Sequence, residues 1–275
     1  MERVRLRPMS AGALRAELSA RNWQRGKTIP HEATYGGVPS VLFQEIEGRH
    51  GNFLDASYAA ILAVPEWAVR LRKSYSADCR VPRQWDRKRC ELDCANSSDA
   101  LLMNVFCFPG VMSHIPLCAL LGVERGLAPS FGYKPRVPIG EKLVDRTEVD
   151  MLLGTLMVEA KLTESGFQTA PLERVLRYRG FEELFDVEEL EIKNGVVQSY
   201  QLIRGVVAAS FGERSFAVLC DARRVDLIEK WFRVMRAVRS CELRSRLAIL
   251  TWQEVAAVAP RELRRFLEAK YGILG

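Results

Sequence analysis

Residues and motifs that many enzyme classes need are scarce or missing in this 275-residue chain. The three histidines, His31, His50 and His114, lie far apart, which leaves little material for a histidine-based triad or for zinc hydrolysis. Neither G-x-G-x-x-G nor G-x-S-x-G is present, and Gly26-Lys27-Thr28 has Arg21 where a phosphate-binding loop would begin with glycine. These absences argue against dinucleotide, P-loop and serine-hydrolase chemistry.

Long hydrophobic runs are also missing. No apolar run long enough for a signal peptide follows the arginine-rich start, and no stretch approaches a membrane span. Seven scattered cysteines, an odd number, favour reduced thiols in the cytoplasm over a disulfide framework. Cys79, Cys90 and Cys94 do not have the spacing of a zinc or iron–sulfur site, so we expect buried thiols without a ligand.

The composition is that of a globular chain with a basic balance. Hydrophobic residues make up 48% of the sequence and charged residues 27%, which is enough for a well-formed core. There are 40 Lys and Arg residues against 34 Asp and Glu, and the pI is about 9.0. This modest excess favours a polyanionic partner but does not require one.

The segment Asp150–Lys161 has the clearest chemical content. It is typical of two short apolar strands joined at Gly154-Thr155, with glycine in the first central place of a type II′ turn. That register places Asp150 directly opposite Glu159, and strand alternation places Glu159 and Lys161 on one face. Two facing carboxylates repel each other, and a divalent cation between them removes this cost. The pattern therefore predicts a metal site with a lysine beside it, although two solvated carboxylates paired with cations would leave the same pattern.

The order of the expected elements predicts a mixed α/β fold. After a helix opened by Asn96-Ser-Ser-Asp99, we expect strands over 143–153 and 156–162 and a helix over 196–211. Buried strands over 215–220 and 246–251 follow, separated by an arginine-rich helix over 223–238, and a helix over 260–271 closes the chain. A sheet that begins antiparallel and ends with a strand reached over a helix is typical of this class.

With these residues at this spacing, the chain resembles the PD-(D/E)XK nuclease superfamily, and more narrowly a group of bacterial proteins described as restriction endonucleases. The matching pieces are Thr147-Glu-Val-Asp150, Leu156-Met-Val-Glu159-Ala-Lys161, Glu164 followed by Phe167, Tyr200-Gln201-Leu-Ile-Arg204, and the strand from Phe216 to Cys220. The resemblance covers about residues 95–252. It implies a restriction-endonuclease-like mixed sheet flanked by helices over 95–275, after a mainly helical region over 1–94.

The resemblance implies a metal-dependent nuclease acting on DNA. Asp150, Glu159 and the backbone carbonyl of Ala160 would ligate Mg²⁺ or Mn²⁺, since hard oxygen donors suit these ions. Lys161 would orient the attacking water or stabilise charge on the phosphorus, and Gln201 would bind the phosphate backbone or hold Lys161. A homodimer is compatible with cutting both strands.

Several alternatives stay open at the level of sequence. Either Asp99 or Glu124 could add an acid to the site, and Glu148 and Glu164 are weaker candidates. The arginine-rich helix carries Arg223, Arg224, Lys230, Arg233, Arg236 and Arg239. A cationic ridge formed by Lys230, Arg233 and Arg236, which recur every third residue, suits phosphate contact and a soluble face equally well. The rival functions are a binding protein that grips nucleic acid without cutting, an RNA-processing or recombination nuclease, and a scaffold. A role in restriction or defence follows from the family label alone.

Overall fold

The computed structural model describes residues 7–33, 39–74, 90–141 and 143–275. Its contacts divide the chain into two compact units, which are described separately here. Unit 1 holds residues 7–10 and Phe131–Thr251, and unit 2 holds the described residues of Ala11–Ser130 together with Trp252–Gly275. The domain boundary predicted at residue 94 lies inside unit 2, and it stays a prediction.

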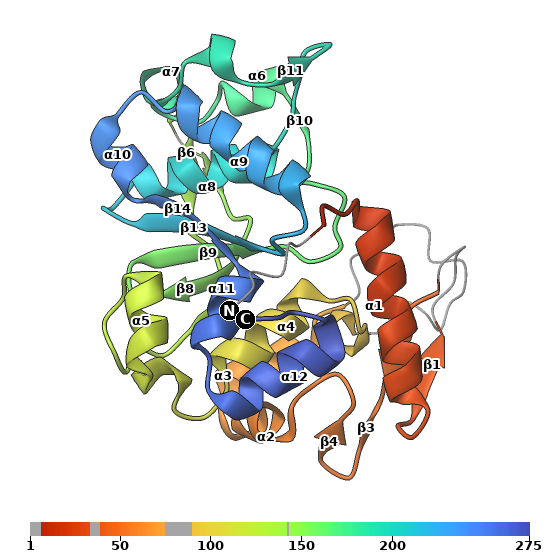
Figure 1. Ribbon diagram of the computed structural model, residues 1–275. Coiled ribbons are helices and arrows are strands. Elements are labelled where there is room, and N and C mark those ends of the chain that lie inside the picture. Colours follow the sequence, from red (N-terminus) through yellow and green to blue (C-terminus); the bar gives the residue numbers. More distant parts are fainter. Residues whose placement is uncertain (1–6, 34–38, 75–89, 142) are drawn as a thin grey trace. The chain divides into compact units, whose positions relative to one another are not determined.

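The main sheet belongs to unit 1 and has five strands in the order β14-β13-β9-β8-β5 (Figure 1). These strands are β5 (Ser130–Tyr133), β8 (Val149–Leu153), β9 (Leu156–Ala160), β13 (Ser215–Cys220) and β14 (Leu247–Thr251). β8 and β9 pair antiparallel, whereas β9 with β13 and β13 with β14 pair parallel. The predicted mixed α/β class is therefore confirmed, including the change from antiparallel to parallel pairing.

The hairpin of β8 and β9 forms as its sequence dictates. Gly154 has a φ of 59° and Thr155 has no positive φ, the pattern of a type II′ turn. Every residue of β9 is buried, which agrees with its central place in the sheet and its apolar composition. The turn and this burial together fix the register of the two strands.

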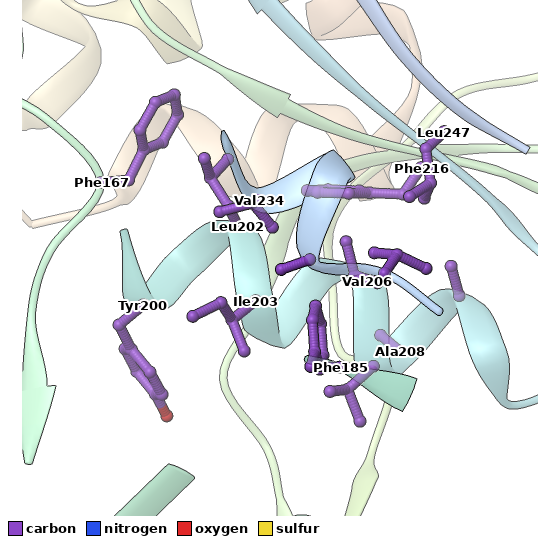
Figure 2. Packing of buried hydrophobic residues seen from close by; sticks show 14 of the residues in the cluster. Phe167, Phe185, Tyr200, Leu202, Ile203, Val206, Ala208, Phe216, Val234 and Leu247 are labelled. Atoms are coloured by element: carbon purple, nitrogen blue, oxygen red, sulfur yellow. The ribbon is translucent and has the colours of Figure 1, made fainter. Parts of the chain in front are cut away.

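Helices α8 (Tyr200–Ser210) and α9 (Val225–Ala237) pack beside each other on one face of this sheet (Figure 1). Their apolar residues form the core of unit 1 with Phe216 of β13, and Figure 2 shows Leu202, Val206 and Val234 among them. Gly205 lets α8 approach the sheet closely, because a Cβ atom there would meet the Phe216 ring. The rest of unit 1 consists of β6 (Val137–Ile139), β7 (Leu143–Asp145), β10 (Ala170–Pro171), α6 (Leu172–Val175), α7 (Phe181–Leu184), β11 (Ile192–Lys193), β12 (Val196–Val197) and α10 (Cys241–Ser245).

Two predicted boundaries in unit 1 are wrong. The helix expected over 196–211 begins at Tyr200, because Val196 and Val197 pair as a short strand with β10 and β11, and Ser199 adopts a left-handed φ of 59°. The strand expected over 143–153 is divided into β7 and β8. Asp145 ends β7 and accepts hydrogen bonds from the backbone N–H and hydroxyl of Thr147, which turns the chain before β8.

Unit 2 is mainly helical with short hairpins. Its elements are α1 (Ala11–Gly26), β1 (His31–Ala33), β2 (Val41–Phe43), β3 (Glu45–Ile46), β4 (Arg49–His50), α2 (Asp55–Ala63), α3 (Pro65–Ala68), α4 (Ser98–Phe106), α5 (Ile115–Leu121), α11 (Trp252–Val258) and α12 (Arg261–Tyr271). Ser97 caps α4 by accepting a hydrogen bond from the Ala100 N–H, as its sequence predicts. In the part of the chain that the structure describes, no helix is long and apolar enough to cross a membrane.

Lys270 of α12 is fully buried in unit 2. Its Nζ donates to Asn22 Oδ1 at 2.9 Å and lies 5.0 Å from the centre of the Phe43 ring. Burial, reinforced by the positive charge of Arg25, holds the pKa of Lys270 well below its usual value. The native core therefore stabilises the charged ammonium less than water does.

We expect Gly205→Ala to destabilise unit 1 by about 1–3 kcal/mol, the usual cost of overpacking. The new Cβ would lie 2.2 Å from Cζ of Phe216, so the helix or the ring must move. Urea unfolding measures the loss. The matched control is Gly12→Ala in α1, where no atom lies within 4 Å of the added Cβ and stability should be unchanged or slightly raised. Equal stability of the two variants would contradict this account of the packing.

We expect Lys270→Met to flatten the pH dependence of stability. The unfolded chain titrates this lysine near its ordinary pKa and the native state titrates it lower, so between the two values the unfolded state binds the extra proton. Wild-type stability should therefore fall as the pH is lowered from about 10.5, by up to about 1.4 kcal/mol per pH unit relative to the variant. Urea unfolding of both proteins between pH 7 and 10 measures the difference. Parallel curves would show that the lysine is charged in the native core.

Candidate functional site

The hairpin brings the predicted acids to adjacent strands of unit 1. Leu153 pairs with Leu156 and Met151 with Val158, and the same register continued by one pair places Asp150 opposite Glu159. The Asp150 carboxylate is turned toward β9, where its Oδ2 accepts a hydrogen bond of 2.7 Å from the Ala160 N–H. The two strands therefore fix Asp150 against the segment that carries Glu159 and Lys161.

Glu159 and Lys161 form a buried ion pair. Lys161 Nζ donates to Glu159 Oε1 at 2.6 Å. Lys161 is 5% exposed and Glu159 is 2% exposed. Burial opposes the ammonium charge, but the negative charges of Glu159, Glu164 and Asp150 outweigh it and raise the pKa of Lys161. The lysine is thus a permanent cation at neutral pH. Both interpretations of the sequence, a site lysine and an ion-pair partner, are compatible with this contact.

The pair lies on the face of the sheet that α8 and α9 cover. Glu159 is in register with Val218 of the parallel strand β13, whose side chain joins the core with both helices. Phe167 belongs to the same core, and its ring lies beneath Lys161, with its centre 5.7 Å from Nζ. Figure 2 shows Phe167 near the N-terminal end of α8.

Gln201 lies in the first turn of α8 and reaches the same neighbourhood through Phe167. Its N–H donates to the Phe167 carbonyl at 3.3 Å, so the residue that contacts Lys161 also holds the helix end. The side-chain Oε1 of Gln201 is buried and has no hydrogen-bond partner among the described residues. A buried amide with an unused acceptor is a suitable group for positioning a donor.

Two buried arginines hold the backbone on either side of the hairpin, and sequence reasoning missed both roles. Arg204 of α8 is 1% exposed and donates from Nη2 to the Glu148 carbonyl at 2.9 Å, two residues before Asp150. Arg224 is fully buried and donates from Nη1 to the Glu164 carbonyl at 2.8 Å, three residues after Lys161. The only sequence signal was the place of Arg204 in the Tyr200–Arg204 motif.

Arg223 and Arg224 are expected on the helix over 223–238 but lie outside it, whereas the ridge expected at Lys230, Arg233 and Arg236 lies on α9. The two arginines precede α9 and are buried: Arg223 makes a bidentate pair with Asp221, and Arg224 pairs with Asp226. Asp221 directly follows β13, so the parallel strands bring this pair to the same edge of the sheet as Lys161.

The remaining cations of residues 225–239 differ in whether a carboxylate pairs with them. Arg233 is 3.0 Å from Glu191, Arg239 is 3.8 Å from Asp186, and Arg236 is exposed. Gly166 lies in the loop between Lys161 and α8, and Lys230 Nζ is close to it. A Cβ atom added at Gly166 would lie 3.1 Å from Lys230 Nζ. Lys230 is therefore the member of this helix placed nearest to the loop of the candidate site.

The other predicted acids differ in their placement. Asp99 in α4 is 3% exposed and pairs with Arg70 at 2.9 Å and Lys73 at 2.7 Å. Glu124 is exposed in the turn after α5. Both belong to unit 2 and are described apart from the hairpin. In unit 1, Glu164 accepts a hydrogen bond from the Leu162 N–H.

The donor set at the hairpin fits a hard divalent cation. Two carboxylates meet on adjacent strands, and Mg²⁺ in phosphoryl sites commonly uses one or two carboxylates plus phosphate and water oxygens. Among the described residues, no group of three or more His, Cys, Asp or Glu side chains could hold a metal ion. An ion at Asp150 and Glu159 would therefore need its other ligands from backbone carbonyl, solvent or substrate oxygens. Of the cysteines, Cys90 and Cys94 carry free thiols, and Cys79 lies outside the described residues.

Comparison with known proteins gives one match. The family described as "Restriction Endonuclease associating with ARP" matches residues 17–272, which is nearly the whole chain. No curated protein and no solved structure matches.

We expect Lys161→Met to cost about 3–5 kcal/mol of stability in metal-free buffer, because it leaves the Glu159 carboxylate buried without its cation. Adding Glu159→Gln should recover part of this loss, since the double variant holds no unpaired charge. Urea unfolding of both single variants and the double variant gives the coupling energy. Additive effects would show that the two groups do not interact.

Proposed function

Because the chain belongs to the family described as restriction endonuclease associating with ARP, we propose that it is a metal-dependent endonuclease that hydrolyses DNA phosphodiester bonds on a PD-(D/E)XK fold. The observation that carries the proposal is the hairpin, where Asp150 is bonded to the Ala160 N–H and the Glu159–Lys161 pair follows on the next strand. Two acids and one cation on adjacent strands are what this chemistry needs.

Asp150, Glu159 and the Ala160 carbonyl would hold Mg²⁺ or Mn²⁺. When bound, the ion would supply Lewis-acid polarisation of the scissile phosphate. A carboxylate has two oxygens, so Glu159 can keep Lys161 on Oε1 and offer Oε2 to the ion. The bound ion would remove the repulsion between the Asp150 and Glu159 carboxylates, which would favour the metal-bound state of the site.

Lys161 would act as a cation, held in place by its contact with Glu159 Oε1. It would stabilise the negative charge that grows on the phosphorane during in-line attack by water. The attacking water would lose a proton to solvent as its oxygen bonds to phosphorus. The P–O3′ bond would then break, and O3′ would take a proton from solvent, which leaves a 3′-hydroxyl and a 5′-phosphate. Gln201 would orient Lys161 or a phosphate oxygen through its amide.

The same proposal includes DNA as the substrate and a role in restriction or defence. It also includes a homodimer that cuts both strands. RNA-processing and recombination nucleases of the same superfamily differ in substrate alone. Branched DNA and structured RNA therefore belong in the same assay.

We expect the wild type to nick or linearise supercoiled plasmid with MgCl₂ or MnCl₂ and to be inactive with EDTA. Asp150→Asn should lower the rate at least about 100-fold, because it removes one of the two charged ligands. The matched control is Glu182→Gln, a neutralised carboxylate on the exposed side of α7, which should cut at the wild-type rate. Gel densitometry gives the rates, and MnCl₂ should raise the melting temperature of the wild type but not of Asp150→Asn.

A second candidate function is a binding protein on the same fold. The burial of Glu159 and Lys161 favours it, because a closed ion pair of this kind also suits a purely structural role. Salt-dependent DNA affinity without cleavage, and without a metal-dependent rise in melting temperature, would select this function and reject the nuclease.

A further inference from the structure

Unit 2 has a second concentration of arginine that belongs to neither the hairpin nor α9. Helices α1 and α12 pack against each other, and two hollows of about 520 and 580 Å³ open along them. Both hollows are lined by Arg25 and Ala269, so they adjoin. We call them together the arginine groove, defined by Arg21, Arg25, Arg261 and Arg265.

The lining of the groove has a net positive charge. Against its four arginines stand two carboxylates, Glu17 and Glu262. Glu17 is engaged by Arg21 at 3.8 Å. Among the described residues, Arg261 and Arg265 have no hydrogen bond or ion pair, and both are exposed. The groove therefore presents cations whose charge is not neutralised within unit 2.

Arg25 is fixed in place by packing. Its guanidinium lies over the Phe266 ring, 5.3 Å from the ring centre, and the residue is half-buried. Its Nε and the Nε of Arg21 are buried and have no hydrogen-bond partner among the described residues. The two buried Nε atoms are out of reach of a ligand, but a guanidinium that packing holds in place is suited to an anionic acceptor.

The spacing of the arginines costs stability when the groove is empty. Arg21 and Arg25 are four residues apart on α1, and Arg261 and Arg265 are four residues apart on α12. Like charges at this spacing on a helix repel each other, so each helix has an unfavourable pair facing the same groove. A polyanion lying along the groove would relieve both repulsions together. Double-stranded DNA carries about one negative charge per 1.7 Å of its axis and fits this need.

We propose that the arginine groove binds the phosphate backbone of DNA, as a site additional to the one at the Asp150–Lys161 hairpin. The choice of DNA as the polyanion rests on the proposed function. The lining residues come from unit 2 alone, and none of them belongs to the catalytic proposal. Because guanidinium groups contact phosphate and no base-reading element is involved, the binding is independent of sequence.

The test measures duplex binding in a protein that does not cut. Asp150→Asn protein in EDTA is titrated into a fluorescent duplex at four salt concentrations, with and without Arg261→Gln and Arg265→Gln. The matched control carries Arg72→Gln and Arg125→Gln, which remove the same charge from exposed positions in unit 2. Circular dichroism and the melting temperature verify that all variants fold.

We expect the groove variant to lose affinity at least about tenfold at low salt, and the slope of log K against log salt concentration to decrease by about 2. The control variant should stay within about twofold of its parent. An unchanged slope in the groove variant, or an equal loss in the control, overturns the proposal. If the groove variant loses affinity for anionic phospholipid vesicles but binds DNA as its parent does, the proposal is overturned in favour of a lipid surface.

Failure of this proposal is distinguishable from failure of the nuclease. Plasmid cutting by the wild type does not depend on the outcome of the binding test. Conversely, a chain that cuts nothing can still show the groove-dependent salt slope.

Discussion

The candidate site depends on the ion pair between Glu159 and Lys161 inside a fully buried strand end. An unpaired carboxylate there would carry a desolvation cost of several kcal/mol, and the ammonium at 2.6 Å offsets it. The neighbouring contacts serve the same pair. Phe167 lies beneath the ammonium, and Arg224 holds the loop that leads away from it through the Glu164 carbonyl. A sheet that placed only apolar residues at these positions would need none of these contacts.

The pair also restricts the chemistry that the lysine can perform. A lysine acts as a general base only when burial or a neighbouring cation lowers its pKa, and three carboxylates do the opposite at Lys161. Lys270 shows the opposite shift in the same chain, because burial and the positive charge of Arg25 lower its pKa. The pKa values of these two buried lysines are thus shifted in opposite directions, because carboxylates outweigh the effect of burial at Lys161, whereas burial dominates at Lys270.

The sequence predicts the hairpin well because its determinants are local. Three local features are sufficient to place Asp150 against β9: glycine at position 154, an apolar strand on each side of it, and side chains that alternate between the two faces of the strands. The start of α8 is not predictable in this way, since Val196 and Val197 are strand residues only through pairing with β10 and β11. The burial of Arg224 is similarly hidden, because its partners at Leu162 and Glu164 are about sixty residues away in the chain. The roles of Asp150, Glu159, Lys161 and Gln201 in catalysis stay predictions.

The count of basic residues is a poor guide to where this chain meets an anion. Arg204 and Arg224 are buried inside unit 1, where each donates to a backbone carbonyl beside the hairpin, so they stabilise the hairpin and are out of reach of a partner. Arg261 and Arg265 have the same side chain without such acceptors among the described residues of unit 2. The net charge of +6 counts both kinds of arginine alike. Exposure and hydrogen-bond partners together separate an arginine that holds the fold from one that can hold phosphate, and this distinction directs attention to Arg261 and Arg265 of α12.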